Sequence, residues 1–150
     1  HGDHAQRLAL TMYLADKSAY EQQRHSPLAH EALVALARDG QLAMCDVVAL
    51  ELLYSTRGPE DYAIRKEALR SLPWLPATAC VGEIALATQE RLAAQGHHRR
   101  PIPDLLIAAT AQVHGATVLH YDKGFDIIAK VTGQPTQWIV PRGAGYGEGS

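Results

Sequence analysis

The sequence contains few cysteines and few aromatic residues, and it has no long hydrophobic run. Cys45 and Cys80 are the only two cysteines among 150 residues, and each lies in a separate apolar segment. We therefore expect buried free thiols rather than a disulfide framework, which favours a reducing compartment. No apolar run approaches the roughly 18 residues that a membrane-spanning helix needs, and the segment HGDHAQRLALT lacks the hydrophobic stretch of a signal peptide. These absences predict a cytoplasmic protein with no membrane association.

Neither sign of charge dominates the sequence. The formal net charge is -2, and charged residues make up 20% of the chain. This balance argues against a protein that coats nucleic acid through a uniformly positive surface, as histones do. It does not argue against a nuclease, because acids gathered in one metal site would leave the remaining surface positive.

The alternation of apolar runs with helical segments predicts one α/β domain. The chain is long enough for one buried core and too short for two. The expected strands are 12–15, 41–45, 117–121 and 136–140; the expected helices are 19–24, 28–38, 47–55, 60–72, 80–95, 105–113 and 125–131. Strands separated by helices of this length imply right-handed crossovers and a parallel sheet.

Local signals set the expected boundaries. Ser26 followed by Pro27 predicts a helix start, Asp46 is expected to cap the helix after it, and Asp126 is expected in the first turn of a late helix. We expect residues 12–141 to form the domain. Residues 1–11 are interpreted as an N-terminal arm or a tag remnant, and the Gly-rich residues 142–150 as a disordered tail.

Two acids directly follow predicted strands. Asp16 comes after the MYLA strand, and Asp122 comes after TVLHY. Ligands of open parallel sheets bind beyond the carboxyl ends of the strands, so both carboxylates are expected at that edge. Two carboxylates close together repel and raise each other's pKa. A Mg²⁺ ion, which prefers oxygen ligands and tolerates clustered carboxylates, would remove this conflict.

Two further acids are candidates for the same cluster. Asp104 stands at the beginning of the apolar segment IPDLLIAATA, and Glu51 is the one charged residue within VVALELLY. Each acid also has a structural alternative. Asp16 and Asp104 could cap helices, Glu51 could face solvent, and Asp122 could be a turn residue. For no single acid does the sequence choose between these alternatives, but the joint placement of the four favours a shared site.

The segments YLADKSAY, VVALELLYS and RRPIPDLLIAATAQVHGATVLHYDKGFDIIAKVTGQ together resemble the PIN-domain nucleases, and within them the VapC-type toxins of bacterial toxin–antitoxin pairs. The likeness extends over about residues 12–140 and is most specific over 103–133. It implies a sheet of about five parallel strands flanked by helices. It also implies four acids around one or two divalent ions, Mg²⁺ or Mn²⁺, at Asp16, Glu51, Asp104 and Asp122.

The resemblance implies an endoribonuclease toxin that is neutralised by a cognate antitoxin and forms a homodimer. Asp16, Asp104 and Asp122 would bind metal directly or through water, and Glu51 would be a ligand or would orient the attacking water. Ser18 matches a small polar residue that helps to orient the first carboxylate. The sequence departs from the family at Lys17, which is often Thr or Ser there, and at Gly124, where many relatives carry another acid.

Basic residues near these acids are candidate contacts for RNA phosphates. Arg99 and Arg100 precede Asp104 in the loop GHHRRPIP, Lys123 follows Asp122, and Lys17 follows Asp16. An exposed polar loop without function is the alternative for the arginines. His120 is interpreted as structural. The alternative for the whole chain is a PIN-like module that binds protein or RNA without turnover.

Overall fold

The structure is a computed structural model that describes residues 10–143. The expected N-terminal arm (1–11) and Gly-rich tail (142–150) therefore fall almost entirely outside the described residues. Within residues 10–143, no helix combines the length and apolar character that crossing a membrane requires.

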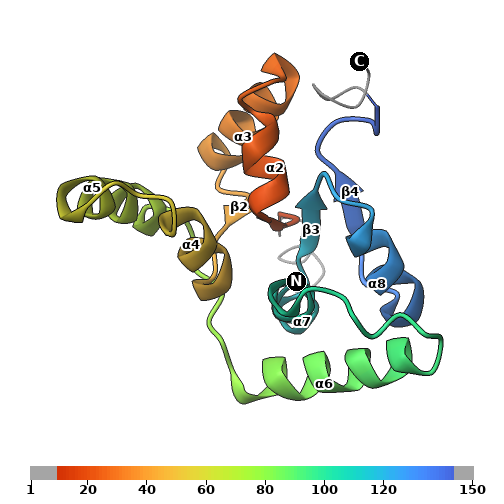
Figure 1. The fold of residues 1–150 in the computed structure, drawn as a ribbon. Helices are drawn as coiled ribbons and strands as arrows, with labels where there is room; N and C mark the ends of the chain where they lie inside the picture. The colour runs from red at the N-terminus through yellow and green to blue at the C-terminus, as the bar shows by residue number, and fades with distance from the viewer. Residues whose placement is uncertain (1–9, 144–150) are drawn as a thin grey trace, which may run out of the picture.

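The described chain forms a parallel sheet flanked by helices on both sides (Figure 1). Its elements, in order, are β1 (Tyr13–Ala15), α2 (Lys17–Gln22), α3 (Pro27–Arg38), β2 (Leu42–Ala43), α4 (Asp46–Leu53), α5 (Pro59–Arg70), α6 (Ala79–Ala93), α7 (Ile102–His114), β3 (Thr117–His120), α8 (Gly124–Thr132) and β4 (Thr136–Trp138). This is the α/β domain that the sequence predicts.

The sheet has four strands in the order β2-β1-β3-β4, close to the expected five. A further parallel bridge joins Met44 to Trp74 beyond β2. The Leu75 N–H donates to the Met44 carbonyl at 2.7 Å, and the Met44 N–H donates to the Pro73 carbonyl at 2.8 Å. Pro73 and Pro76 bracket this piece, and proline cannot donate to a strand ladder, so the pairing ends after one bridge.

The register of β1 and β3 divides the core between the two faces of the sheet. Leu14 pairs with Val118, and Ala15 pairs with Leu119. Successive side chains of a strand point to opposite faces. Leu14 and Val118 accordingly pack with the buried side of α7, whereas Ala15 and Leu119 pack with α3, which contributes Leu33.

Three expectations about individual residues need correction. Asp46 is the first residue of α4 rather than its N-cap, and its Oδ1 accepts a hydrogen bond from Trp74 Nε1 at 2.8 Å. Cys45 is buried as expected, but Cys80, in the first turn of α6, is exposed. Helix α2 begins two residues earlier than expected because Asp16 caps it.

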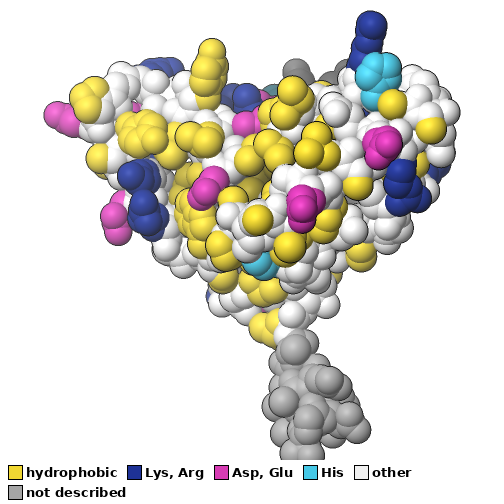
Figure 2. Space-filling model, turned by 90° about the horizontal axis from the view of Figure 1, so that it is seen from below, with side chains coloured by type: hydrophobic (Ala, Val, Ile, Leu, Met, Phe, Trp, Pro, Cys, Tyr) yellow, Lys and Arg dark blue, Asp and Glu magenta, His cyan; other side chains and the backbone are white. Residues whose placement is uncertain are grey.

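Hydrophobic side chains also lie on the surface. The large exposed ones include Leu50 and Tyr54 near the end of α4, Ile64 on α5 and Leu86 on α6. Seen from below, hydrophobic side chains gather over the middle of this face, between a few charged groups (Figure 2). Helix α5 projects sideways from the body of the domain (Figure 1).

Candidate active site

Asp16 lies at the carboxyl end of β1, beside the end of β3. Its N–H donates to the Leu119 carbonyl at 3.0 Å, and its side chain is 5% exposed. One carboxylate oxygen accepts hydrogen bonds from the Ala19 N–H at 3.3 Å and from Ser18 Oγ at 2.7 Å. Burial above all, with a smaller effect of the negative charge of Asp122, raises the pKa of Asp16 to about 6 against the lowering effect of the hydrogen bonds from Ser18 and Ala19. Asp16 therefore caps α2 and also belongs to the sheet edge, so the two expectations for it are compatible.

Ser18 connects the first acid to the neighbouring strand. Its hydroxyl donates to Asp16 Oδ1 and accepts a hydrogen bond from the Tyr121 N–H at 2.8 Å. The contact with Asp16 is the one that the resemblance implied. The same hydroxyl therefore fixes the Asp16 carboxylate relative to the segment that carries Asp122.

Asp104 occupies the first turn of α7 and is 9% exposed. Helix α7 begins at Ile102, so Asp104 is not at the N-cap. Burial above all, together with the charges of Asp16, Asp122 and Glu51 and against the opposing charge of Arg100, raises the pKa of Asp104 to about 7. The charges of the other three acids therefore reach Asp104, and that of Asp122 also reaches Asp16.

Glu51 is more exposed than Asp16 and Asp104. It lies on α4 and is half-buried. Burial raises its pKa, while Lys17 lowers it and Glu21 raises it. Lys17 in turn lies 3.9 Å from Glu21 in an ion pair within α2. Glu51 and Lys17 therefore stand at the rim of the acid cluster.

Arg100 and Gly124 are both close to the acids. A Cβ on Gly124 would lie 2.9 Å from a guanidinium nitrogen of Arg100, 3.2 Å from Asp122 Oδ1 and 3.8 Å from Asp104 Oδ2. The Gly124 N–H donates to Asp122 Oδ1 at 2.8 Å. Gly124 thus keeps open a space that is shared by two carboxylates and one guanidinium. The guanidinium supplies a positive charge to this acidic space.

Comparisons with known proteins agree with this architecture. The model of the PIN domain matches residues 18–131. Ribonuclease VapC51 of Mycobacterium tuberculosis is 43% identical over 131 residues, which cover 87% of this chain and 95% of the relative. The chain belongs to the PIN-domain family.

Solved structures with low sequence identity show the same fold as this PIN domain. One is VapBC2 from Rickettsia felis bound to a promoter DNA fragment (TM-score 0.69, 19% identity, 85% of this chain and 98% of the other). Another is VapBC-5 from Mycobacterium tuberculosis, described as a member of the VapBC family of toxin–antitoxin systems (TM-score 0.57, 24% identity, 86% and 98% covered).

His120 is a residue of this PIN domain whose contacts the sequence did not reveal. Its side chain is fully buried, and its Nδ1 accepts a hydrogen bond from the Asp122 N–H at 3.1 Å. Burial lowers the pKa of His120, so the ring is neutral with its proton on Nε2. That nitrogen lies 3.6 Å from Asp126 Oδ1, too far for a hydrogen bond. His120 therefore holds the backbone of the segment that carries Asp122.

The donor set of this PIN domain suits a divalent cation. Among residues 10–143, no three acid, histidine or cysteine side chains form a ready-made cage for a metal ion. The acids nevertheless supply carboxylate oxygens, and burial together with mutual repulsion raises the pKa of Asp16 and Asp104. A divalent cation would relieve that repulsion, and the missing Cβ of Gly124 leaves room beside Asp104 and Asp122.

Proposed function

We propose that this chain is a metal-dependent endoribonuclease that acts as a toxin in the cytoplasm and is held inactive by a cognate antitoxin. The observation that carries the proposal is that carboxylate oxygens of Asp104 and Asp122 lie 3.8 Å and 3.2 Å from one point, the position of a Cβ on Gly124. The raised pKa of Asp104, caused by burial and by the charges of Asp16, Asp122 and Glu51, supports a shared acidic site. Such a site suits phosphodiester hydrolysis with Mg²⁺ or Mn²⁺. The names of the relatives, which are ribonucleases, support the same activity.

The four acids would have different roles. Asp16, Asp104 and Asp122 would hold one or two divalent ions, directly or through water. A divalent cation at this place would supply Lewis acidity, which makes water a better nucleophile and offsets charge on a phosphate. Glu51, which comes from α4, would be a further ligand or would orient the attacking water.

Basic residues would bind the RNA backbone around this point. Arg100, whose guanidinium lies beside Asp104 and Asp122, would donate to oxygens of the scissile phosphate. Arg99 and Lys123 are exposed, and Lys17 stands at the rim, so they would contact the neighbouring phosphates. Ser18 would act on substrate through the position of Asp16.

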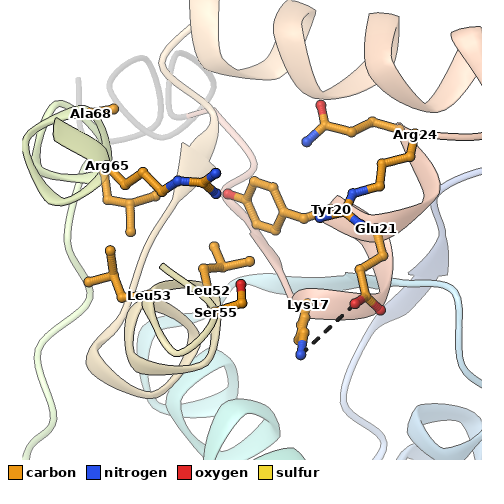
Figure 3. A pocket seen from close by; sticks show the side chains of 11 residues that line it. Lys17, Tyr20, Glu21, Arg24, Leu52, Leu53, Ser55, Arg65 and Ala68 are labelled. Atoms are coloured by element: carbon orange, nitrogen blue, oxygen red, sulfur yellow. Dashed lines mark ion pairs between the residues drawn. The ribbon is translucent and has the colours of Figure 1, made fainter. Parts of the chain in front are cut away.

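The antitoxin is proposed to occupy the cavity between α2, α4 and α5. This cavity of about 560 Å³ is lined by Leu52, Leu53 and Leu69 and by three basic residues. Figure 3 shows those basic residues around the ring of Tyr20: Lys17 from α2, Arg24 from the turn after α2, and Arg65 from α5. A partner segment with apolar and acidic side chains would match this lining. Occupation of this cavity would also cover Lys17 at the rim of the acid cluster.

A homodimer is part of the same proposal. Helix α3 exposes Leu28 and Val34, which are 66% and 45% exposed, on the side of the sheet opposite α7. Pairing of two such faces would bury these side chains. Sedimentation of the purified chain, with Val34→Asp as the variant expected to shift it to a monomer, tests this arrangement.

Replacement of Asp104 tests the ribonuclease activity. Asp104→Asn keeps the shape of the side chain but removes its charge, so cleavage of RNA in Mg²⁺ should fall more than about a hundredfold. EDTA should abolish wild-type cleavage. Asp39→Asn, at the exposed end of α3, is the matched control and should cleave normally. RNA binding by the wild type without any metal-dependent cleavage would instead favour a binding module.

A further inference from the structure

A second cavity adjoins the acid cluster at the carboxyl ends of β3 and β4. It has a volume of about 330 Å³ and is lined by Ser18, Tyr121, Asp122, Lys123, Trp138 and Arg142. Strands β3 and β4 pair in parallel, with His120 beside Trp138. This register places the aromatic residue that follows β3 next to the one that ends β4.

The indole of Trp138 is held in a fixed position. Its Nε1 donates to Asp126 Oδ2 at 3.0 Å, and its ring lies 5.0 Å from the buried ring of His120. Tyr121 meets it edge-on, with the ring centroids 5.2 Å apart and the planes at 84°. The Tyr121 hydroxyl accepts a hydrogen bond from the Gly143 N–H at 3.1 Å. Two aromatic rings are therefore fixed at this edge by the protein itself.

A flat cation already lies over one of these rings. The guanidinium carbon of Arg142 is 5.7 Å from the centroid of the Trp138 ring. Lys123 lines the same cavity and is exposed. Aromatic rings accompanied by Arg and Lys are what single-stranded nucleic acid binds, because bases stack on the rings while the cations contact phosphates.

The cavity is continuous with the acid cluster. Asp122 and Ser18 line it, and Ser18 also donates to Asp16. An RNA strand whose phosphate lies at the acids would therefore bring a neighbouring nucleotide to Trp138. We propose that this cavity is a nucleobase subsite in which a base next to the scissile phosphate stacks on Trp138. Lys123 and Arg142, which line the same cavity, supply positive charge for the adjacent phosphate. This inference rests on the proposed ribonuclease function.

Tryptophan fluorescence tests the stacking directly. The sequence has two tryptophans, and the other, Trp74, is bonded to Asp46 at the β2 edge of the sheet. In a Trp74→Phe, Asp104→Asn chain with Mg²⁺, a short single-stranded oligoadenylate should quench Trp138 fluorescence. An abasic ribose-phosphate oligomer of the same length should leave it almost unchanged. Equal quenching by both probes, or none by either, would overturn the subsite.

Affinity measurements give a second, independent test. Trp138→Leu in the Asp104→Asn background should weaken binding of the oligoadenylate about tenfold, as expected for the loss of one stacked base. Trp138→Phe should restore most of the affinity because phenylalanine also stacks, and Trp74→Leu should change nothing. Unchanged affinity in Trp138→Leu would overturn the subsite.

The test also separates this inference from the proposed function. If the wild type cleaves RNA but Trp138 fluorescence does not respond to the oligoadenylate, the subsite is rejected and the proposed ribonuclease function stands. Absence of both cleavage and RNA binding would reject the proposed function and the subsite together. A Trp138 signal that responds to the purified antitoxin but not to RNA would assign this face to the protein partner and overturn the subsite.

Discussion

Helices α5 and α7 have almost the same length but opposite surroundings. α7 spans 13 residues and buries seven of them, including Asp104, whereas α5 spans 12 residues and buries none. α7 is held between the sheet and α6, so the side chain in its first turn has a fixed position. α5 gains little from the core, which leaves its side chains available to a partner. In the proposed function, α7 carries an acid of the metal site and α5 faces the antitoxin.

The largest effect is expected from a variant that removes a buried contact next to the acids. His120→Leu removes the acceptor for the Asp122 N–H, and outer contacts of this kind are worth about 10- to 100-fold in metal affinity. His120→Asn should restore much of that affinity, because its side-chain oxygen can accept from the N–H two residues on. Mn²⁺ titration followed by electron paramagnetic resonance measures both. Equal affinities for the Leu and Asn variants would show that His120 only fills space.

A smaller change fills the space beside the acids. Gly124→Ala places a methyl group near Arg100 and Asp122, so we expect cleavage to fall about tenfold as Arg100 is displaced. The backbone of Gly124 is helical, so alanine should stabilise the fold by up to about 1 kcal/mol. We therefore expect the cleavage rate, measured by steady-state kinetics, to fall while the free energy of unfolding, measured with urea, rises. Gly82→Ala, in open space on α6, is the control.

The buried acids should also make metal-free stability depend on pH. The pKa of Asp16 is raised to about 6 and that of Asp104 to about 7 from an ordinary value of 3.8. Between about pH 4 and 7 the folded chain binds more protons than the unfolded chain, so the free energy of unfolding falls as pH rises. In EDTA, Tm should drop by about 10 °C or more between about pH 4 and 7, and Mg²⁺ should reduce the drop near pH 7. Asp104→Asn should flatten the profile; an unchanged slope would contradict the shared cluster.

Substitutions on the exposed face of α5 should have the smallest effect on stability and cleavage. Ile64, on α5, is 71% exposed, so Ile64→Ser should change the free energy of unfolding by less than about 0.5 kcal/mol and leave RNA cleavage unchanged. Its effect should appear in binding to the purified cognate antitoxin, measured by calorimetry. Leu86→Ser, 68% exposed on α6, is the matched control because α6, unlike α5, contributes no residue to the lining of the cavity between α2, α4 and α5. Equal antitoxin affinities for both variants would remove α5 from the interface.

Much of this molecule can be predicted from its sequence because local signals carry the information. The strand ends mark Asp16 and Asp122, and the apolar run after Pro103 marks the helix of Asp104. The sequence placed Arg100 near Asp104, but its position beside Gly124 and the hydrogen bond of His120 could not be predicted. Both depend on how distant elements pack, and a lone histidine or arginine carries no periodic signal.

The errors have similar causes. Asp46 looks like a helix cap, but Trp74, from a segment far along the chain, takes its carboxylate. Cys80 lies in an apolar stretch, yet α6 turns that position to solvent. In each case tertiary packing overrides a local preference.

The bond between Ser18 and Tyr121 has a consequence for protein synthesis. It joins groups that are 103 positions apart, so Asp16 is linked through Ser18 to the segment that carries Asp122 only after β3 and that segment have left the ribosome and docked beside β1. A nascent chain that stops short of Asp122 lacks a complete acid cluster. Incomplete translation products would therefore be harmless to the RNA around them.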